Sequence, residues 1–135
     1  QNQIKKRLIM ETHFGLNYHE TAETTNGRLF LATSNIPRND PGTPWHLHTN
    51  EDEWILVISG ALCVDALDKQ NIIKPGAHLK IPKGEWHRWR PVSDVPTHAL
   101  FLFSPAGIEN MFRELDKQPD RIGAISEKHG TVFLD

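Results

Sequence analysis

The chain has 135 residues, of which 38% are hydrophobic and 24% charged, and its formal net charge is −2. These values are typical of one soluble globular domain with a hydrophobic core, so we expect a single domain over residues 1–135. The near-neutral charge and the lack of a basic run argue against nucleic acid as a partner. No apolar run reaches the roughly 18–20 residues of a membrane span, which argues against a membrane protein.

The N-terminal sequence bears on the cellular compartment. The N-terminal sequence QNQIKKRLIMETHF lacks the long apolar centre of a signal peptide, and we expect a cytoplasmic protein. The chain starts at Gln1 rather than Met, which is compatible with removal of a leader. The single cysteine, Cys63, excludes an internal disulfide framework, and in the apolar run ALCV we expect it to be a small buried hydrophobic residue.

The segment from about residue 24 to residue 104 has the pattern of short strands. Pro and Gly recur along it, and the runs between them are apolar or alternating: GRLFLAT, EWILVIS, ALCVDAL, HLKI, HRWR and HALFLF. Short strands with turn signals about 8–12 residues apart predict a sandwich or barrel of antiparallel strands. We expect this segment to form the core of a barrel.

The pattern changes to helical after residue 105. The apolar residues Ile108, Met111, Phe112 and Leu115 fall on one face of a helix. A second helix is predicted from Pro119 to about His129, where Gly130 ends it, and the last residues, TVFLD, could form a short strand. The sequence therefore predicts an all-β barrel with a C-terminal helical cap over about residues 105–130.

The segment TPWHLHTNEDEWILVISG, residues 43–60, carries the polar groups that indicate a site. His46 and His48 would share one face of a strand, since side chains alternate. Glu53 has the opposite parity, but the polar quartet TNED can form a turn or bulge that resets it. Among the three acidic residues there, Glu53 is the one that opens the next strand toward the interior, because Glu51 lies within the turn and Asp52 faces the other way.

A third imidazole is available from GAHLKIPKGEWHRW. In His87-Arg88-Trp89-Arg90 the two arginines share one face, so His87 and Trp89 are predicted to face inward. Buried ionisable groups are costly unless something pairs them, and a divalent metal would do so. We therefore expect His46, His48, Glu53 and His87 to come together around a metal.

These segments resemble the two motifs of the cupin superfamily. The first reads His46-x-His48, four residues, Glu53, six residues, Gly60; the second reads Gly76, five residues, Pro82-x-Gly84, two residues, His87. The 15 residues between Gly60 and Gly76 are as in compact bacterial cupins, and the C-terminal third is similar to small quercetin-dioxygenase-like members. Two positions depart from the motifs: Gly42 lies closer to His46 than usual, and Pro91 stands where Asn is common.

The resemblance implies a double-stranded β-helix, or jelly-roll, barrel that binds one metal through His46, His48, Glu53 and His87, usually as a homodimer. The metal would be Fe, Mn, Ni, Co, Cu or Zn, since these ligands accept several divalent ions. In quercetin-dioxygenase-like cupins the glutamate is also implicated as the base that takes the substrate hydroxyl proton, a role that would fall on Glu53.

Three functions remain open at this point. The first is a dioxygenase that acts on a small phenolic or enolisable, flavonol-like molecule. The second is a metal-containing binder or sensor of a small molecule without turnover. The third is an isomerase or cyclase that uses the metal as a Lewis acid. Fold alone does not decide among them, because one fold hosts many functions.

The pocket walls are expected to be apolar. The candidates are Trp89, Phe101, Phe103, Met111 and Phe112, although Met111 and Phe112 are more often simple packing residues of a helix. His78 lies near the second motif and is a weaker candidate for lining the site. Both faces of HALFLF are apolar, so one of them is expected to meet a partner subunit or the helices.

Overall fold

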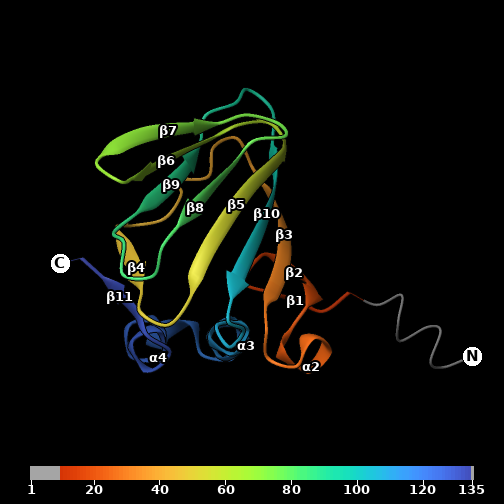
Figure 1. The fold of residues 1–135 in the computed structure, drawn as a ribbon, viewed down its shortest axis with the longest axis vertical. Coiled ribbons are helices and arrows are strands. Elements are labelled where there is room, and N and C mark those ends of the chain that lie inside the picture. Colours follow the sequence, from red (N-terminus) through yellow and green to blue (C-terminus); the bar gives the residue numbers. More distant parts are fainter. Residues whose placement is uncertain (1–9, 135) are drawn as a thin grey trace, which may run out of the picture.

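The computed structural model describes residues 10–134. The interpretation of residues 1–9 as lacking a signal peptide, and the last residue of TVFLD, lie outside this range. The six strands of the largest sheet lie in the order β1-β2-β3-β10-β5-β8, all antiparallel (Figure 1). Their bounds are β1 Thr12–His13, β2 Leu16–Glu20, β3 Phe30–Ile36, β5 Asp52–Ser59, β8 His78–Ile81 and β10 Thr97–Ser104.

Two smaller sheets form the other side of the barrel. One has the order β7-β6-β9 and the other pairs β11 with β4 (Figure 1). Their strands are β4 His46–His48, β6 Leu62–Ala66, β7 Lys69–Ile73, β9 Arg88–Pro91 and β11 Thr131–Phe133. This architecture confirms the predicted all-β jelly-roll barrel.

The barrel interior follows from the alternation of side chains along the strands. In β10 every second residue is buried, so Phe101 and Phe103 face inward while Leu100 and Leu102 face outward. The buried residues of β3, β5 and β10 form most of the core together with the helix residues Met111 and Leu115. Cys63 is buried, as expected.

The helices gather at one end of the barrel (Figure 1). They are α2 Ala22–Thr25, α3 Glu109–Lys117, the 3₁₀ helix η1 Pro119–Arg121 and α4 Ile122–Lys128. The two predicted C-terminal helices and the strand after Gly130 are thus confirmed. In residues 10–134 no helix is long and apolar enough to cross a membrane.

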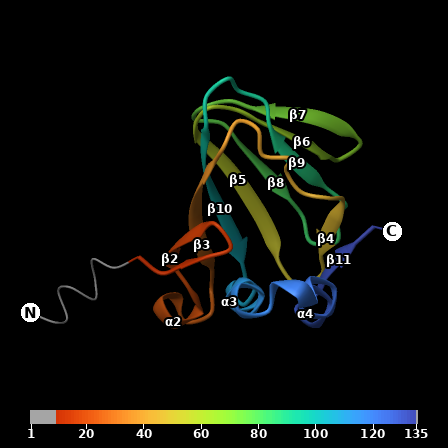
Figure 2. The ribbon, with the colours of Figure 1, turned by 180° about the vertical axis from the view of Figure 1, so that it is seen from behind.

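The sequence patterns did not indicate the β1–β2 hairpin. It precedes residue 24, the expected start of the barrel core, and extends the large sheet through pairs between β2 and β3. Seen from behind, the hairpin lies beside α3 (Figure 2).

Candidate functional site

Three histidine rings meet inside the barrel. His46 and His48 come from β4, and His87 precedes β9. The backbones of His46 and His87 exchange two hydrogen bonds of 2.9 and 3.0 Å, which brings the segment before β9 beside β4. The ring centroids of His46 and His87 lie 4.2 Å apart, and that of His48 lies 5.0 and 5.4 Å from them. Parity along β4 thus turns both of its histidines inward, as predicted.

Each histidine is oriented by a bond at Nδ1. His46 donates from Nδ1 to the carbonyl oxygen of Pro44 at 2.8 Å, and His87 donates to that of Glu85 at 2.9 Å. His48 Nδ1 lies 2.9 Å from the hydroxyl oxygen of Thr131, on β11. These contacts leave the Nε2 atoms facing the interior, and an outer partner at Nδ1 is the usual arrangement of metal-binding histidines.

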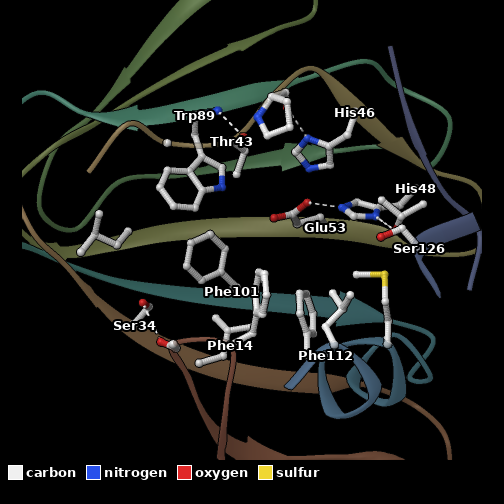
Figure 3. Close-up of a pocket in the computed structure, with 18 of the residues that line it drawn as sticks. Phe14, Ser34, Thr43, His46, His48, Glu53, Trp89, Phe101, Phe112 and Ser126 are labelled. Carbon is white, nitrogen blue, oxygen red and sulfur yellow. Dashed lines mark hydrogen bonds and ion pairs between the residues drawn. The ribbon is translucent and has the colours of Figure 1, made fainter. Parts of the chain in front are cut away.

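Glu53 lies against two of these rings and is almost fully buried. Its Oε1 is 3.1 Å from His87 Nε2. The same oxygen is 3.3 Å from His48 Nε2 (Figure 3). Burial opposes ionisation of this carboxyl, but the hydrogen bonds from His48 and His87 outweigh it and hold the pKa of Glu53 below its ordinary value. Burial alone would lower the pKa of His87, yet its hydrogen bond to Glu53 raises that pKa.

His46 is in a different protonation environment. Burial first, and then the neighbouring His87 and His48, lower the pKa of His46 to about 4. Its ring is therefore neutral at neutral pH, with the proton on Nδ1 and a lone pair on Nε2. A neutral imidazole is the form that binds a metal.

The donor set fits a divalent transition metal. One ring nitrogen from each of His46, His48 and His87 lies within 4.8 Å of the others, so the three could hold one ion. Glu53 touches two of the three and supplies a carboxylate oxygen at the same place. Imidazole and carboxylate together suit the ions expected from the sequence, Fe, Mn, Ni, Co, Cu or Zn.

A cavity of about 540 Å³ reaches this cluster. Its lining includes all five residues expected as walls, namely Trp89, Phe101, Phe103, Met111 and Phe112. Trp89 and Phe101 lie together at a centroid distance of 5.8 Å (Figure 3). The ring of Phe103 is perpendicular to that of His48, at a centroid distance of 5.6 Å. The volume is in the range of cavities that take small organic molecules.

The position of Trp89 is fixed by hydrogen bonds between its backbone and the loop before β4. Thr43 donates its N–H to the carbonyl oxygen of Trp89 at 2.9 Å and accepts the Trp89 N–H on its hydroxyl oxygen at 3.0 Å. Gly42 has φ +79°, and a Cβ at this position would overlap that same carbonyl oxygen. The early glycine of the motif is therefore required for the loop to lie on β9.

The charge of the lining is one-sided. Among the cavity residues in the described part of the chain, Glu53 and Asp40 carry carboxylates, and there is no lysine or arginine. Sites that bind carboxylate or phosphate commonly use arginine or lysine. The described lining therefore offers an anionic ligand no cationic side chain, and any positive charge in the cavity would come from the metal.

Several residues of the site were not found from the sequence. Thr131 orients His48, and Phe14, Ile122 and Ser126 line the cavity from segments far from the motifs. His78, by contrast, is exposed on β8 and is not part of the lining.

Glu51, which the sequence placed in a turn, is also buried. Its Oε2 has no hydrogen-bond partner, and burial raises the pKa of this carboxyl. The parity argument had chosen Glu53 over Glu51, and only Glu53 lines the cavity and lies against the histidines.

Comparison with known proteins agrees with this geometry. A family model of the cupin domain matches residues 32–103, the segment from β3 to β10 that carries all four polar residues of the cluster. This chain belongs to the cupin family. Among curated proteins, Protein SchB of Streptomyces halstedii is 32% identical to this chain over 85 aligned residues. The alignment covers 63% of this chain and 59% of SchB. The match thus spans about three fifths of that relative.

Solved structures show the same fold at low sequence identity. KdgF from Halomonas sp. superposes on the cupin with a TM-score of 0.60 at 20% identity, covering 74% of this chain and 89% of KdgF. A predicted oxalate decarboxylase from Thermotoga maritima gives 0.62 at 18% identity, covering 67% and 78%. These likenesses establish the barrel.

Proposed function

We propose that this cupin is a metal-dependent dioxygenase for a small phenolic or enolisable substrate of the flavonol kind. The observation that carries the proposal is the meeting of His46, His48, His87 and Glu53 at the inner end of an aromatic cavity. One divalent transition metal per chain is the cofactor we propose.

The bound metal would supply Lewis acidity and, for Fe, Mn, Ni, Co or Cu, exchange of electrons with the substrate and dioxygen. The chain's own residues would hold and prepare the substrate. Trp89 and Phe101 present aromatic surface beside the cluster, where a planar ring can stack. A bound aromatic substrate would displace water from these apolar walls, which would strengthen electrostatic interactions at the reacting oxygen.

Glu53 is the proposed base. Its carboxylate lies against His48 and His87, which places it where a substrate hydroxyl would meet the metal and within reach of that hydroxyl's proton. Transfer of that proton to a Glu53 oxygen leaves the substrate as an enolate or phenolate. Dioxygen is the co-reactant that then oxidises it.

The lining also supports an uncharged aromatic substrate over a small dicarboxylate or a phosphorylated sugar. Those anions would find no cationic side chain in the described lining, so the metal alone would have to balance their charge. A phenol, by contrast, enters the cavity uncharged and becomes an anion only when the base removes its proton beside the metal.

The first test is elemental analysis of untagged protein purified without chelator, beside the variant His46→Ala/His87→Ala. We expect near-stoichiometric Fe, Mn, Ni, Co or Cu in the parent and its loss in the variant. Zinc would favour a Lewis-acid isomerase or cyclase. Absence of metal even after reconstitution would overturn the oxygenase and leave a binding barrel.

Glu53→Gln then tests the base. We expect this variant to retain some metal, yet to lose flavonol-dependent oxygen uptake by about a hundredfold or more, as for the loss of a general base. Glu127→Gln, at an exposed position on α4, is the matched control and should behave as the parent. Unchanged oxygen uptake by Glu53→Gln would refute the role of this carboxylate.

A further inference from the structure

An aromatic side chain occupies an unusual turn at the edge of the cavity. Phe14 and Gly15 link β1 to β2 and have φ values of +54° and +79°, while His13 and Leu16 pair across the hairpin. Two-residue hairpin turns with positive φ at both positions favour Asn, Asp or Gly, and a bulky residue there is unfavourable. Such an outlier suggests that the side chain of Phe14 has a role that offsets this cost.

The turn is held in place by α3. Asp116, near the end of this helix, accepts the Phe14 backbone N–H on Oδ1 at 2.9 Å, and its Oδ2 lies 2.8 Å from His13 Nδ1. His13 Nε2 lies 2.8 Å from Glu11, which also pairs with Arg113 of α3 at 2.9 Å. We call these contacts of Glu11, His13, Phe14, Arg113 and Asp116 the hairpin clasp. The clasp fixes the position of the turn against the helix.

The ring of Phe14 lies at the outer end of the cavity. The residue is 49% exposed and is also part of the cavity lining, so it borders both solvent and the interior. Its ring centroid is 6.1 Å from that of Phe112 on α3, whose side chain lines the same cavity (Figure 3).

A series of aromatic rings continues inward from this pair. Phe112 and Phe103 line the cavity, and the fully buried Phe30 packs behind them, 6.3 Å from Phe112 and stacked on Phe103 at 5.8 Å. Phe103 in turn contacts His48 at 5.6 Å. Aromatic surface therefore extends from the exposed turn to the histidine cluster. Neutral aromatic molecules gain contact energy along such a wall, whereas charged ones lose hydration.

We propose that Phe14 is a gate residue of the cavity, which selects neutral aromatic ligands together with Phe112, and that Asp116 is the positioning residue that holds it there. The inference deepens the proposed function, because it rests on the cavity being the substrate site. It does not depend on the identity of the metal or on oxygen chemistry. Ligands enter and leave past the β1–β2 turn, and the Phe14 ring slows their departure.

The decisive variant is Phe14→Asn, since asparagine suits the turn better than phenylalanine. The probe is N-phenyl-1-naphthylamine, a neutral molecule with two aromatic units whose fluorescence rises in apolar surroundings. The part of the tryptophan-to-probe energy transfer that is lost in Trp89→Phe identifies probe beside Trp89, because the other three tryptophans remain in that variant. We expect Phe14→Asn to unfold at the same or a higher temperature than the parent, while the dissociation rate of the probe rises about tenfold.

Phe14→Trp should restore slow dissociation, because it replaces one aromatic ring by another. Failure of the parent to bind the probe in the cavity, or equal dissociation rates in the parent and Phe14→Asn, would overturn the gate. If the parent releases the probe slowly and Phe14→Asn releases it fast, but the parent takes up no oxygen with any substrate, the dioxygenase proposal is refuted and the gate proposal stands.

A double-mutant cycle tests Asp116. In the parent background Asp116→Ala should speed probe dissociation several-fold, whereas in the Phe14→Asn background it should add nothing, because its effect passes through Phe14. Equal effects in both backgrounds would show that Asp116 supports the fold generally and would remove its positioning role. Asp120→Ala, an exposed carboxylate beyond the same helix, is the control and should leave the rate unchanged.

Discussion

His46 couples the stability of the metal-free protein to pH. Its pKa falls from 6.5 to about 4 on folding, mainly through burial. Between these values the unfolded chain binds a proton at this residue that the folded chain does not, so stability rises with pH across the window and is lost as the pH falls through it. A shift of this size corresponds to about 3 kcal/mol.

We therefore expect the free energy of unfolding of chelator-treated protein to decrease more steeply between pH 6.5 and pH 4 than that of His46→Gln. Urea denaturation at several pH values measures both. His87 does not produce the same slope, because its raised pKa places its contribution at higher pH, where stability is lost as the pH rises. Parallel profiles for the two proteins would contradict the assignment to His46.

At the scale of single residues, the sequence predicted which side chains form the polar cluster, but not the residues that surround and orient them. Parity within β4, and the motif spacing, place His46, His48 and His87 correctly, because strand alternation is a local property. The contact of His48 with Thr131 joins residues 83 positions apart, and no local pattern reports it.

A buried carboxylate joins the helices to the hairpin region. Glu109, in the first turn of α3, is fully buried. Its carboxylate accepts the backbone N–H of Ala22 at 2.7 Å and that of Gly107 at 2.5 Å, and its carbonyl oxygen accepts the Tyr18 hydroxyl at 2.7 Å. Glu109 therefore ties the starts of α2 and α3 together.

Glu109→Ala should leave both N–H groups without their acceptor. We expect the free energy of unfolding to fall by about 2–4 kcal/mol, because two partly buried donors lose their charged acceptor. Glu127→Ala, at an exposed position, should change it by less than about 0.5 kcal/mol. Urea denaturation compares the two, and a Glu109→Ala protein as stable as the parent would show that this link carries no stability.

Elements with strong patterns were predictable, and those fixed by distant partners were not. The apolar face of α3 and the alternation of β10 are visible in the sequence. The hairpin of β1 and β2 was missed because its turn, Phe14-Gly15, is not one of the usual turn dipeptides and its strands are short. Its position depends instead on side chains of α3, 102 or 103 residues later.

The outer face of the large sheet indicates how whole molecules associate. Partly exposed apolar side chains lie side by side across β3, β10 and β5, where Leu102 pairs with Leu31 and Trp54, and Leu100 pairs with Leu56. The helices lie at the end of the barrel rather than on this face (Figure 1). Contiguous apolar surface of this kind commonly marks an interface.

We expect the protein to be a homodimer through this face, which is one of the two alternatives, a partner subunit or the helices, that the two-sided strand HALFLF left open. Leu100→Glu would place a charge at its centre, and sedimentation velocity should then show a monomer where the parent shows a dimer. Ile72→Glu, an exposed position on β7 of another sheet, should remain dimeric. A parent that sediments as a monomer at tens of micromolar would contradict this interface.

The pairing of β4 with β11 also affects the order in which the site is completed during synthesis of the chain. A ribosome completes β4 long before it reaches Thr131, and domains begin to fold while the chain is still emerging. Until β11 arrives, β4 lacks its ladder partner and His48 lacks the hydroxyl that orients its ring. The nascent chain therefore lacks the contact that orients His48 until synthesis is almost complete, and we expect binding of the proposed metal to be one of the last events in the maturation of the protein.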